Sequence, residues 1–149
     1  MKYRLILFDF DGTLADSLPW FVRTFNQVAE KYGFKRIEPG NLEAVRRMGP
    51  ASLLKYLEVP RWKLPLIAVH MRRLMARDIM EIRRFEGVNP SLAKLSHHGI
   101  MLALVTSNSL ENVGRVLGLE TLDLIPYREC DVGMFGKASR INMDDDVPR

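Results

Sequence analysis

Two short apolar runs limit how this chain can fold. Residues 3–8 and 100–105 are mostly apolar, and each run ends in a polar residue, Asp9 after the first and Thr106 after the second. Apolar runs of this length, without strict alternation, are typical of strands buried on both faces of a parallel sheet. Parallel strands need a crossover between them, usually a helix. The runs therefore predict an α/β sheet with polar groups at the carboxyl ends of its strands.

The region between the two runs, residues 16–85, has a helical pattern. Apolar residues recur at intervals of three and four, and prolines and glycines fall where helices begin or end. The expected helices cover 18–32, 41–48, 51–57 and 62–84. An all-helical insert therefore follows the first strand at its carboxyl end, which is the edge where open α/β sheets bind ligands.

After the insert, helical and strand patterns alternate. Asn89 is expected to cap one helix, and Asn108 with Glu111 resembles a capping box for the next. The short apolar stretch at 122–125 predicts a third strand. Outside the insert the order is strand, helix, strand, helix, strand, which indicates a parallel sheet with crossover helices.

Composition narrows the classes of function. Charged residues make up 27% of the 149 residues and the net charge is +4, a balance typical of globular proteins. Most of the positive excess lies in the arginines of 62–84, which we interpret as a solvent-exposed helix face, because no nucleic-acid motif accompanies them. No apolar run is long enough for a membrane span or a signal peptide. With a single cysteine, Cys130, these features predict a cytoplasmic protein without nucleic-acid or membrane partners.

The residues after the first strand carry the clearest chemical signal. Asp9 and Asp11 are separated by one residue, and carboxylates this close repel each other unless a cation lies between them. Mg²⁺ prefers such oxygen ligands, and Gly12 lets the backbone approach a bound group closely. An ordinary acidic turn is the alternative interpretation of this segment.

The sequence FDFDGTLADS, which contains both aspartates, resembles the first motif of the haloacid dehalogenase (HAD) superfamily. The resemblance implies that Asp9 is a nucleophile that forms an aspartyl-phosphate. It implies that Asp11 is the general acid and base, and that both aspartates hold Mg²⁺. An aspartate at position 11 separates the phosphatases of this family from its dehalogenases.

Two later segments resemble further motifs of the same family. LVTSN matches a strand that ends in a phosphate-binding Thr or Ser, and MFGKA matches the context of a lysine that stabilises the nucleophile and the phosphoryl charge. The phosphate-binding residues implied are Thr106, Ser107, Asn108, Lys137 and Gly12. The alternatives are a turn with Thr and Asn as helix caps, and a solvent-exposed lysine.

The resemblance also implies a domain organisation. A HAD-like, Rossmann-like α/β core is expected over 1–15 and 86–149, and a helical cap domain over 16–85. Arg46 and Arg47 lie where related caps contact substrate, and arginine suits a carboxylate-bearing substrate such as phosphoglycolate. Two exposed arginines at a helix end are the alternative.

A fourth acidic motif, which supplies further metal ligands in the family, is not found. Asp144–Asp146 follows Lys137 too closely for a helix and a strand to fit between them. The core is therefore expected to be incomplete at its C-terminus. An incomplete sheet exposes an edge, through which we expect self-association.

Together the motifs predict a Mg²⁺-dependent phosphomonoester hydrolase that resembles phosphoglycolate phosphatases. Its expected substrate is a small phosphorylated metabolite, cleaved through an aspartyl-phosphate. Two alternatives stay open. One is a truncated, catalytically weak or inactive remnant that binds phosphate or a partner chain, and the other is a phosphomutase with the same core.

Overall fold

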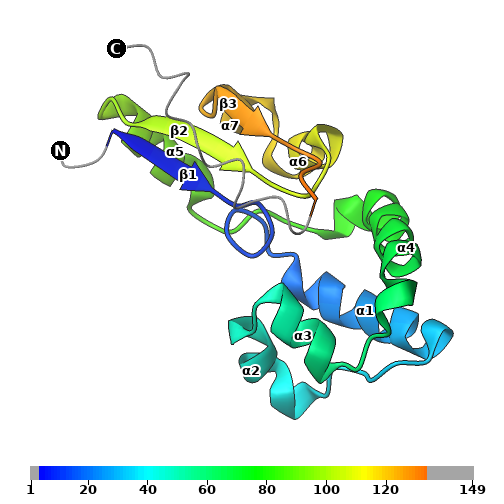
Figure 1. The fold of residues 1–149 in the computed structure, drawn as a ribbon. Coiled ribbons are helices and arrows are strands. Elements are labelled where there is room, and N and C mark those ends of the chain that lie inside the picture. Colours follow the sequence, from blue (N-terminus) through cyan, green and yellow to red (C-terminus); the bar gives the residue numbers. More distant parts are fainter. Residues whose placement is uncertain (1–3, 134–149) are drawn as a thin grey trace. The chain divides into compact units, whose positions relative to one another are not determined.

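The chain divides into two compact units. The structure, a computed structural model, describes residues 4–133. One unit, here called the helical unit, is Ser17–Glu81, and the other, the sheet unit, consists of the described residues of 1–16 and 82–149. Figure 1 shows the elements of both.

Three parallel strands form the sheet, in the order β1-β2-β3. They are β1 (Leu5–Phe8), β2 (Met101–Val105) and β3 (Tyr127–Glu129). Leu5 lies opposite Met101, and Ala103 lies opposite Tyr127. The predicted parallel α/β sheet is confirmed.

The predicted strand at 122–125 is wrong. Helix α7 (Leu119–Asp123) covers most of this stretch, and β3 begins later, at Tyr127. Leu122 and Ile125, at 5% and 0% exposure, are three residues apart, so they pack from one side of a helical turn rather than from a strand.

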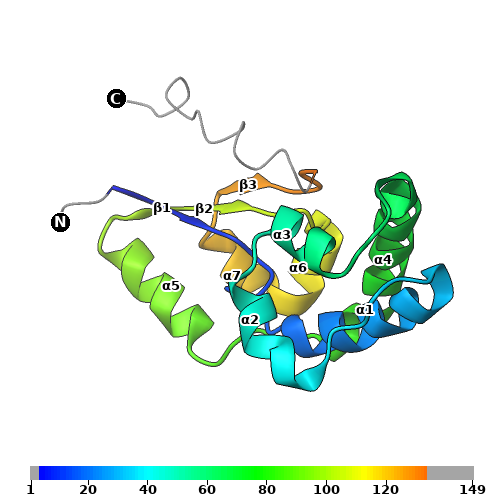
Figure 2. The same cartoon turned by 60° about the horizontal axis from the view of Figure 1, so that its bottom comes forward.

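The other helices of the sheet unit are α5 (Val88–His97) and α6 (Leu110–Leu117). With α7 they lie against one face of the sheet (Figure 2), as expected when successive right-handed crossovers proceed in one direction. The predicted N-caps, Asn89 and Asn108, are both wrong. Gly87, at a φ of 80°, precedes α5 in place of Asn89. Ser109 caps α6 in place of Asn108, because its hydroxyl accepts the Asn112 N–H at 3.2 Å.

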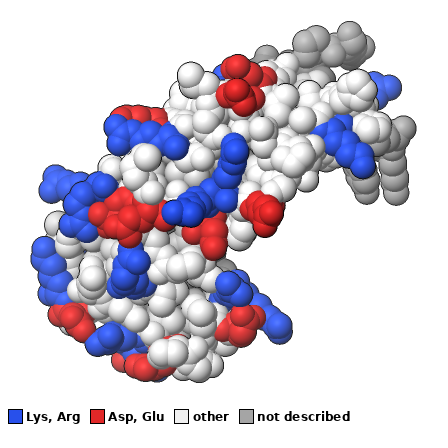
Figure 3. Space-filling model, turned by 180° about the vertical axis from the view of Figure 1, so that it is seen from behind, with Lys and Arg blue, Asp and Glu red and all other residues white. Residues whose placement is uncertain are grey.

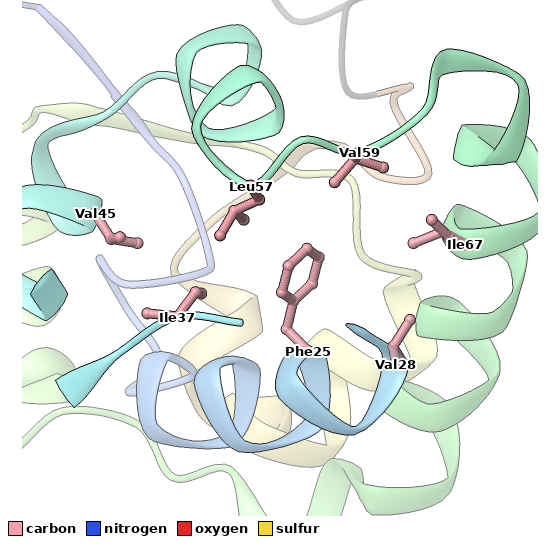
Figure 4. Close-up of a cluster of buried hydrophobic side chains, with 7 residues drawn as sticks. All are labelled: Phe25, Val28, Ile37, Val45, Leu57, Val59 and Ile67. Atoms are coloured by element: carbon pink, nitrogen blue, oxygen red, sulfur yellow. The ribbon is translucent and has the colours of Figure 1, made fainter. Parts of the chain in front are cut away.

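The helical unit has its own hydrophobic core. Its α-helices are α1 (Leu18–Tyr32), α2 (Leu42–Arg47), α3 (Pro50–Tyr56) and α4 (Leu64–Asp78). Short 3₁₀ helices cover Pro39–Asn41, Arg61–Lys63 and Ile79–Glu81, so the helix predicted over 62–84 is shorter than expected. Figure 4 shows the buried cluster: Phe25, Val28, Ile37, Val45, Leu57, Val59 and Ile67.

The chain enters and leaves the helical unit through two segments that pair within the sheet unit. Ala15 and Arg84 form an antiparallel bridge. The Asp16 N–H donates to the Arg83 carbonyl at 2.8 Å, and the Phe85 N–H donates to the Leu14 carbonyl at 3.0 Å. The two ends of the insert are therefore joined by backbone hydrogen bonds.

Charged side chains of both signs are mixed on the face drawn in Figure 3. Several charged side chains of the protein form ion pairs, for example Arg115 with Glu111 at 2.6 Å and Arg36 with Glu30 at 2.6 Å. Among the described residues, no helix combines the length and apolar character that crossing a membrane requires.

Candidate functional site

The loops after β1 and β2 lie at the same edge of the sheet, because the two strands are parallel. The first loop is a tight turn built on Phe10, which is fully buried. Its carbonyl accepts the N–H groups of Leu14 and Ala15, both at 3.0 Å. Gly12, at a φ of 73°, takes the left-handed conformation that glycine adopts without strain. The turn fixes the backbone on either side of Asp11.

Asp9, the first residue after β1, accepts a hydrogen bond from the backbone of the next residue. The Phe10 N–H donates to its Oδ1 at 2.8 Å. A carboxylate has two oxygens and several acceptor sites, so one such bond leaves it able to accept others. The bond restricts the rotation of the carboxylate.

The second loop is held by hydrogen bonds on both sides of Thr106, which has no exposed surface. Its Oγ1 accepts the Asn108 N–H at 3.0 Å. Its own N–H donates to the Glu129 carbonyl at 2.9 Å, and its carbonyl accepts the Val132 N–H at 3.1 Å. The chain after β3 therefore anchors the loop that follows β2.

A direct contact joins the two loops. Asn108 Nδ2 donates to the Asp11 carboxylate, at 3.3 Å to Oδ2 and 3.5 Å to Oδ1. These residues are 97 positions apart in the sequence. The fold thus brings together one residue from each of the first two motifs.

Asn112, on α6, is a residue of this site that the sequence analysis missed. Its Nδ2 donates to Asn108 Oδ1 at 2.8 Å, and both side chains are buried. One feature of the sequence points to Asn112. The buried face of α6 is otherwise apolar, with Val113 and Leu117, and an amide there requires a polar partner.

The other predicted site residues lie elsewhere or are not described. Ser107 is half-buried in the second loop. Arg46 and Arg47 belong to α2 of the helical unit, where both are exposed and Arg46 pairs with Glu43 at 2.9 Å. Lys137 and the acidic run 144–146 lie outside the described residues.

The magnesium ligands implied by the resemblance, Asp9 and Asp11, are oxygen donors. Within residues 4–133, no group of three or more His, Cys, Asp or Glu side chains could hold a metal ion. Mg²⁺ is commonly bound through only one or two carboxylates together with phosphate oxygens. Asp9 and Asp11, two hard oxygen donors after β1, fit this mode of binding.

Cys130, just past β3, is not an activated nucleophile. Burial raises the pKa of its thiol, and neighbouring Asp131 raises it further. A reactive cysteine needs the opposite shift, toward the thiolate.

Comparison with known proteins finds a family model that matches most of the chain. Residues 6–129 match the family model described as haloacid dehalogenase-like hydrolase. A phosphoglycolate phosphatase from Synechococcus elongatus is 29% identical over 120 residues, which cover 78% of this chain. The chain spans 57% of the length of that relative.

Solved structures agree on the fold. A Lactobacillus plantarum protein superposes with a TM-score of 0.72 at 20% identity, covering 100% of this chain and 65% of its own. CbbY from Rhodobacter sphaeroides, solved in complex with phosphate, superposes with a TM-score of 0.64 at 20% identity, covering 86% and 63%. At these identities the likeness establishes the fold alone.

Proposed function

Because the chain belongs to the haloacid dehalogenase-like hydrolase family, we propose that it hydrolyses a phosphate monoester of a small metabolite in a Mg²⁺-dependent reaction. The observation that carries the proposal is the contact between Asp11 and Asn108. It joins one of the two carboxylates after β1 to a polar loop after β2. The naming of one relative as a phosphoglycolate phosphatase, and the phosphate bound by CbbY, support the same class of substrate.

In the proposed mechanism, an Asp9 oxygen attacks phosphorus and forms an aspartyl-phosphate as the alcohol leaves. Asp11 donates a proton to the leaving oxygen. It then takes a proton from the water that hydrolyses the aspartyl-phosphate, so that phosphate and both free carboxyl groups are regenerated. The Asp9 carboxylate and the backbone carbonyl of Asp11 would hold Mg²⁺, which when bound offsets the negative charge of the phosphoryl group.

The second loop would bind the phosphoryl oxygens. The Thr106 hydroxyl accepts one hydrogen bond, from the Asn108 N–H, and a hydroxyl that accepts can still donate its own proton. Ser107 and the backbone of Gly12 are further candidate donors, and Lys137 is proposed from the resemblance alone. Donors fixed before the reaction stabilise charge without reorganisation.

The test is phosphate release from p-nitrophenyl phosphate and from phosphoglycolate, with Mg²⁺ and with EDTA. We expect Mg²⁺-dependent release that is abolished by Asp9→Asn and reduced by about 10²–10⁴-fold by Asp11→Asn. Asp123→Asn is the matched control, because it removes an exposed carboxylate of α7 in the same unit. Undiminished release by Asp9→Asn, or no release by the parent chain with Mg²⁺ in excess, would contradict the proposal.

Arg46 and Arg47 are proposed as contacts to a substrate carboxylate. The two substrates separate this role from a general one, since p-nitrophenyl phosphate has no carboxylate. Arg46→Ala should raise KM for phosphoglycolate and leave KM for p-nitrophenyl phosphate unchanged. An equal effect on both substrates, or on neither, would remove Arg46 from the site.

A further inference from the structure

The buried amide of Asn112 has a specific partner. Asn112 is 7% exposed on the inner face of α6, next to Val113 at 0%. A buried polar side chain is costly unless it is hydrogen-bonded. Its Nδ2 donates to Asn108 Oδ1 at 2.8 Å, so the donor end of Asn112 is directed at the acceptor end of Asn108.

The backbone of Asn108 is fixed independently. Its N–H donates to Thr106 Oγ1 at 3.0 Å, and its carbonyl accepts the Asp131 N–H at 2.9 Å. With both backbone groups engaged, what remains to be set is the orientation of the side-chain amide. That amide has two ends of similar shape and opposite hydrogen-bonding character.

The orientation of the Asn108 amide matters because its other end faces the Asp11 carboxylate. Asn108 Nδ2 lies 3.3 Å from Asp11 Oδ2. An N–H that faces a carboxylate donates a hydrogen bond to it, whereas a carbonyl oxygen in the same place has no proton to donate. Only one of the two orientations of the Asn108 amide therefore holds the Asp11 carboxylate by a hydrogen bond.

We propose that Asn112 is a positioning residue that holds the Asn108 amide with its N–H groups, not its carbonyl oxygen, toward Asp11. The inference rests on the proposed function, in which Asp11 exchanges protons with the substrate and with water. Asn112 acts through Asn108 and does not touch the reacting atoms. It sets the side-chain orientation on which the direction of the Asp11 carboxylate depends.

Asn112→Asp is the decisive variant. It is nearly isosteric but offers only acceptors when ionised, so Asn108 is expected to turn its N–H groups toward the new carboxylate and its carbonyl oxygen toward Asp11. Asn112→Ala removes the partner without supplying another. Asn89→Asp is the matched control. It places the same charge in the same unit and keeps the acceptor that binds the Thr121 hydroxyl at 3.3 Å.

The first measurement needs no activity. The side-chain amide resonances of Asn108, assigned by their loss in Asn108→Ala, are followed in ¹⁵N–¹H spectra of the whole chain. In the parent chain and in Asn89→Asp, adding Asp11→Asn should shift these resonances. In Asn112→Asp and Asn112→Ala that shift should be lost, and its persistence in both would overturn the inference.

The second measurement is kcat and KM for phosphate release. In both Asn112 variants kcat should fall with KM unchanged, whereas Asn89→Asp should leave both unchanged. A loss confined to stability, with an unmoved kcat, would reduce Asn112 to a structural role. If the parent chain releases no phosphate, the proposed function fails, and the resonance measurement still decides the role of Asn112.

Discussion

Replacing Thr106 by valine tests the turn that builds the second loop. Valine has a similar shape but lacks the hydroxyl that accepts the Asn108 N–H at 3.0 Å. Thr106 is 0% exposed and Asn108 is 7% exposed, so water cannot readily replace the lost acceptor. A buried donor left unsatisfied costs about 1–3 kcal/mol. We therefore expect the sheet unit to lose about 2 kcal/mol of stability, or roughly a 30-fold change in its unfolding equilibrium.

Amide hydrogen exchange, followed by NMR, measures the loss of stability in the sheet unit, to which Thr106 belongs. Trp20 and Trp62, the two tryptophans of the chain, both lie in Ser17–Glu81, so tryptophan fluorescence reports on the helical unit instead. The amides of β2 should exchange roughly 30-fold faster in Thr106→Val. The Asn108 amide should be affected most.

Thr106→Ser is the control for this prediction. It keeps the hydroxyl and loses a buried methyl, which costs about 0.8 kcal/mol. The Asn108 amide should stay protected in Thr106→Ser and lose protection in Thr106→Val. If the two variants protect that amide equally, the hydroxyl does not hold the turn and the reasoning fails.

Three further predictions concern pH, the helical unit and the sheet edge. His70 Nδ1 is buried without a hydrogen-bond partner among the described residues, and burial, then Lys31, lowers the pKa of the ring below 6.5. The folded state therefore binds fewer protons there than the unfolded state, so the fluorescence-detected unfolding free energy should fall as pH drops through 6.5, less so in His70→Leu. Asp78→Ala should cost about 1–3 kcal/mol in the same assay, since the carboxylate accepts Trp20 Nε1 at 3.2 Å. The hydrogen bond from Arg77 lowers the pKa of Asp78. The stability contributed by the charged Asp78 carboxylate should therefore be lost only as the pH falls below 3.8. Self-association through β1 should appear as a concentration-dependent mass in sedimentation equilibrium, reduced by Leu7→Lys; a constant mass in the parent chain would reject it.

The strands differ in how much of their structure the sequence reveals. β2 could be predicted because burial on both faces requires an apolar run, and residues 102–105 are buried. β3 could not, since Tyr127–Glu129 is exposed and pairs with β2 through its backbone, which leaves no apolar pattern. The apolar stretch at 122–125 wrongly predicts a strand because a short run has the same composition in a strand and in a helical turn.

The candidate site shows a similar division. Asp9 and Asp11 could be predicted because their spacing and their place after a strand are local features. The link between Asn108 and Asp11 spans 97 positions, and no local pattern encodes it. Asn108 and Ser109 are both good cap residues, and local sequence cannot tell which one the backbone will use.

The hydrogen bonds between the two ends of the helical unit also affect the free-energy cost of replacing the residues between those ends. The entropy lost on closing a chain loop grows only logarithmically with its length, by about 0.6 kcal/mol for each doubling. With Leu14 and Asp16 bonded to Phe85 and Arg83, the sheet unit is attached to a loop that is already closed. A shortened or foreign segment grafted between these residues should leave the register of β1 and β2 intact, so that this part of the chain is free to diverge.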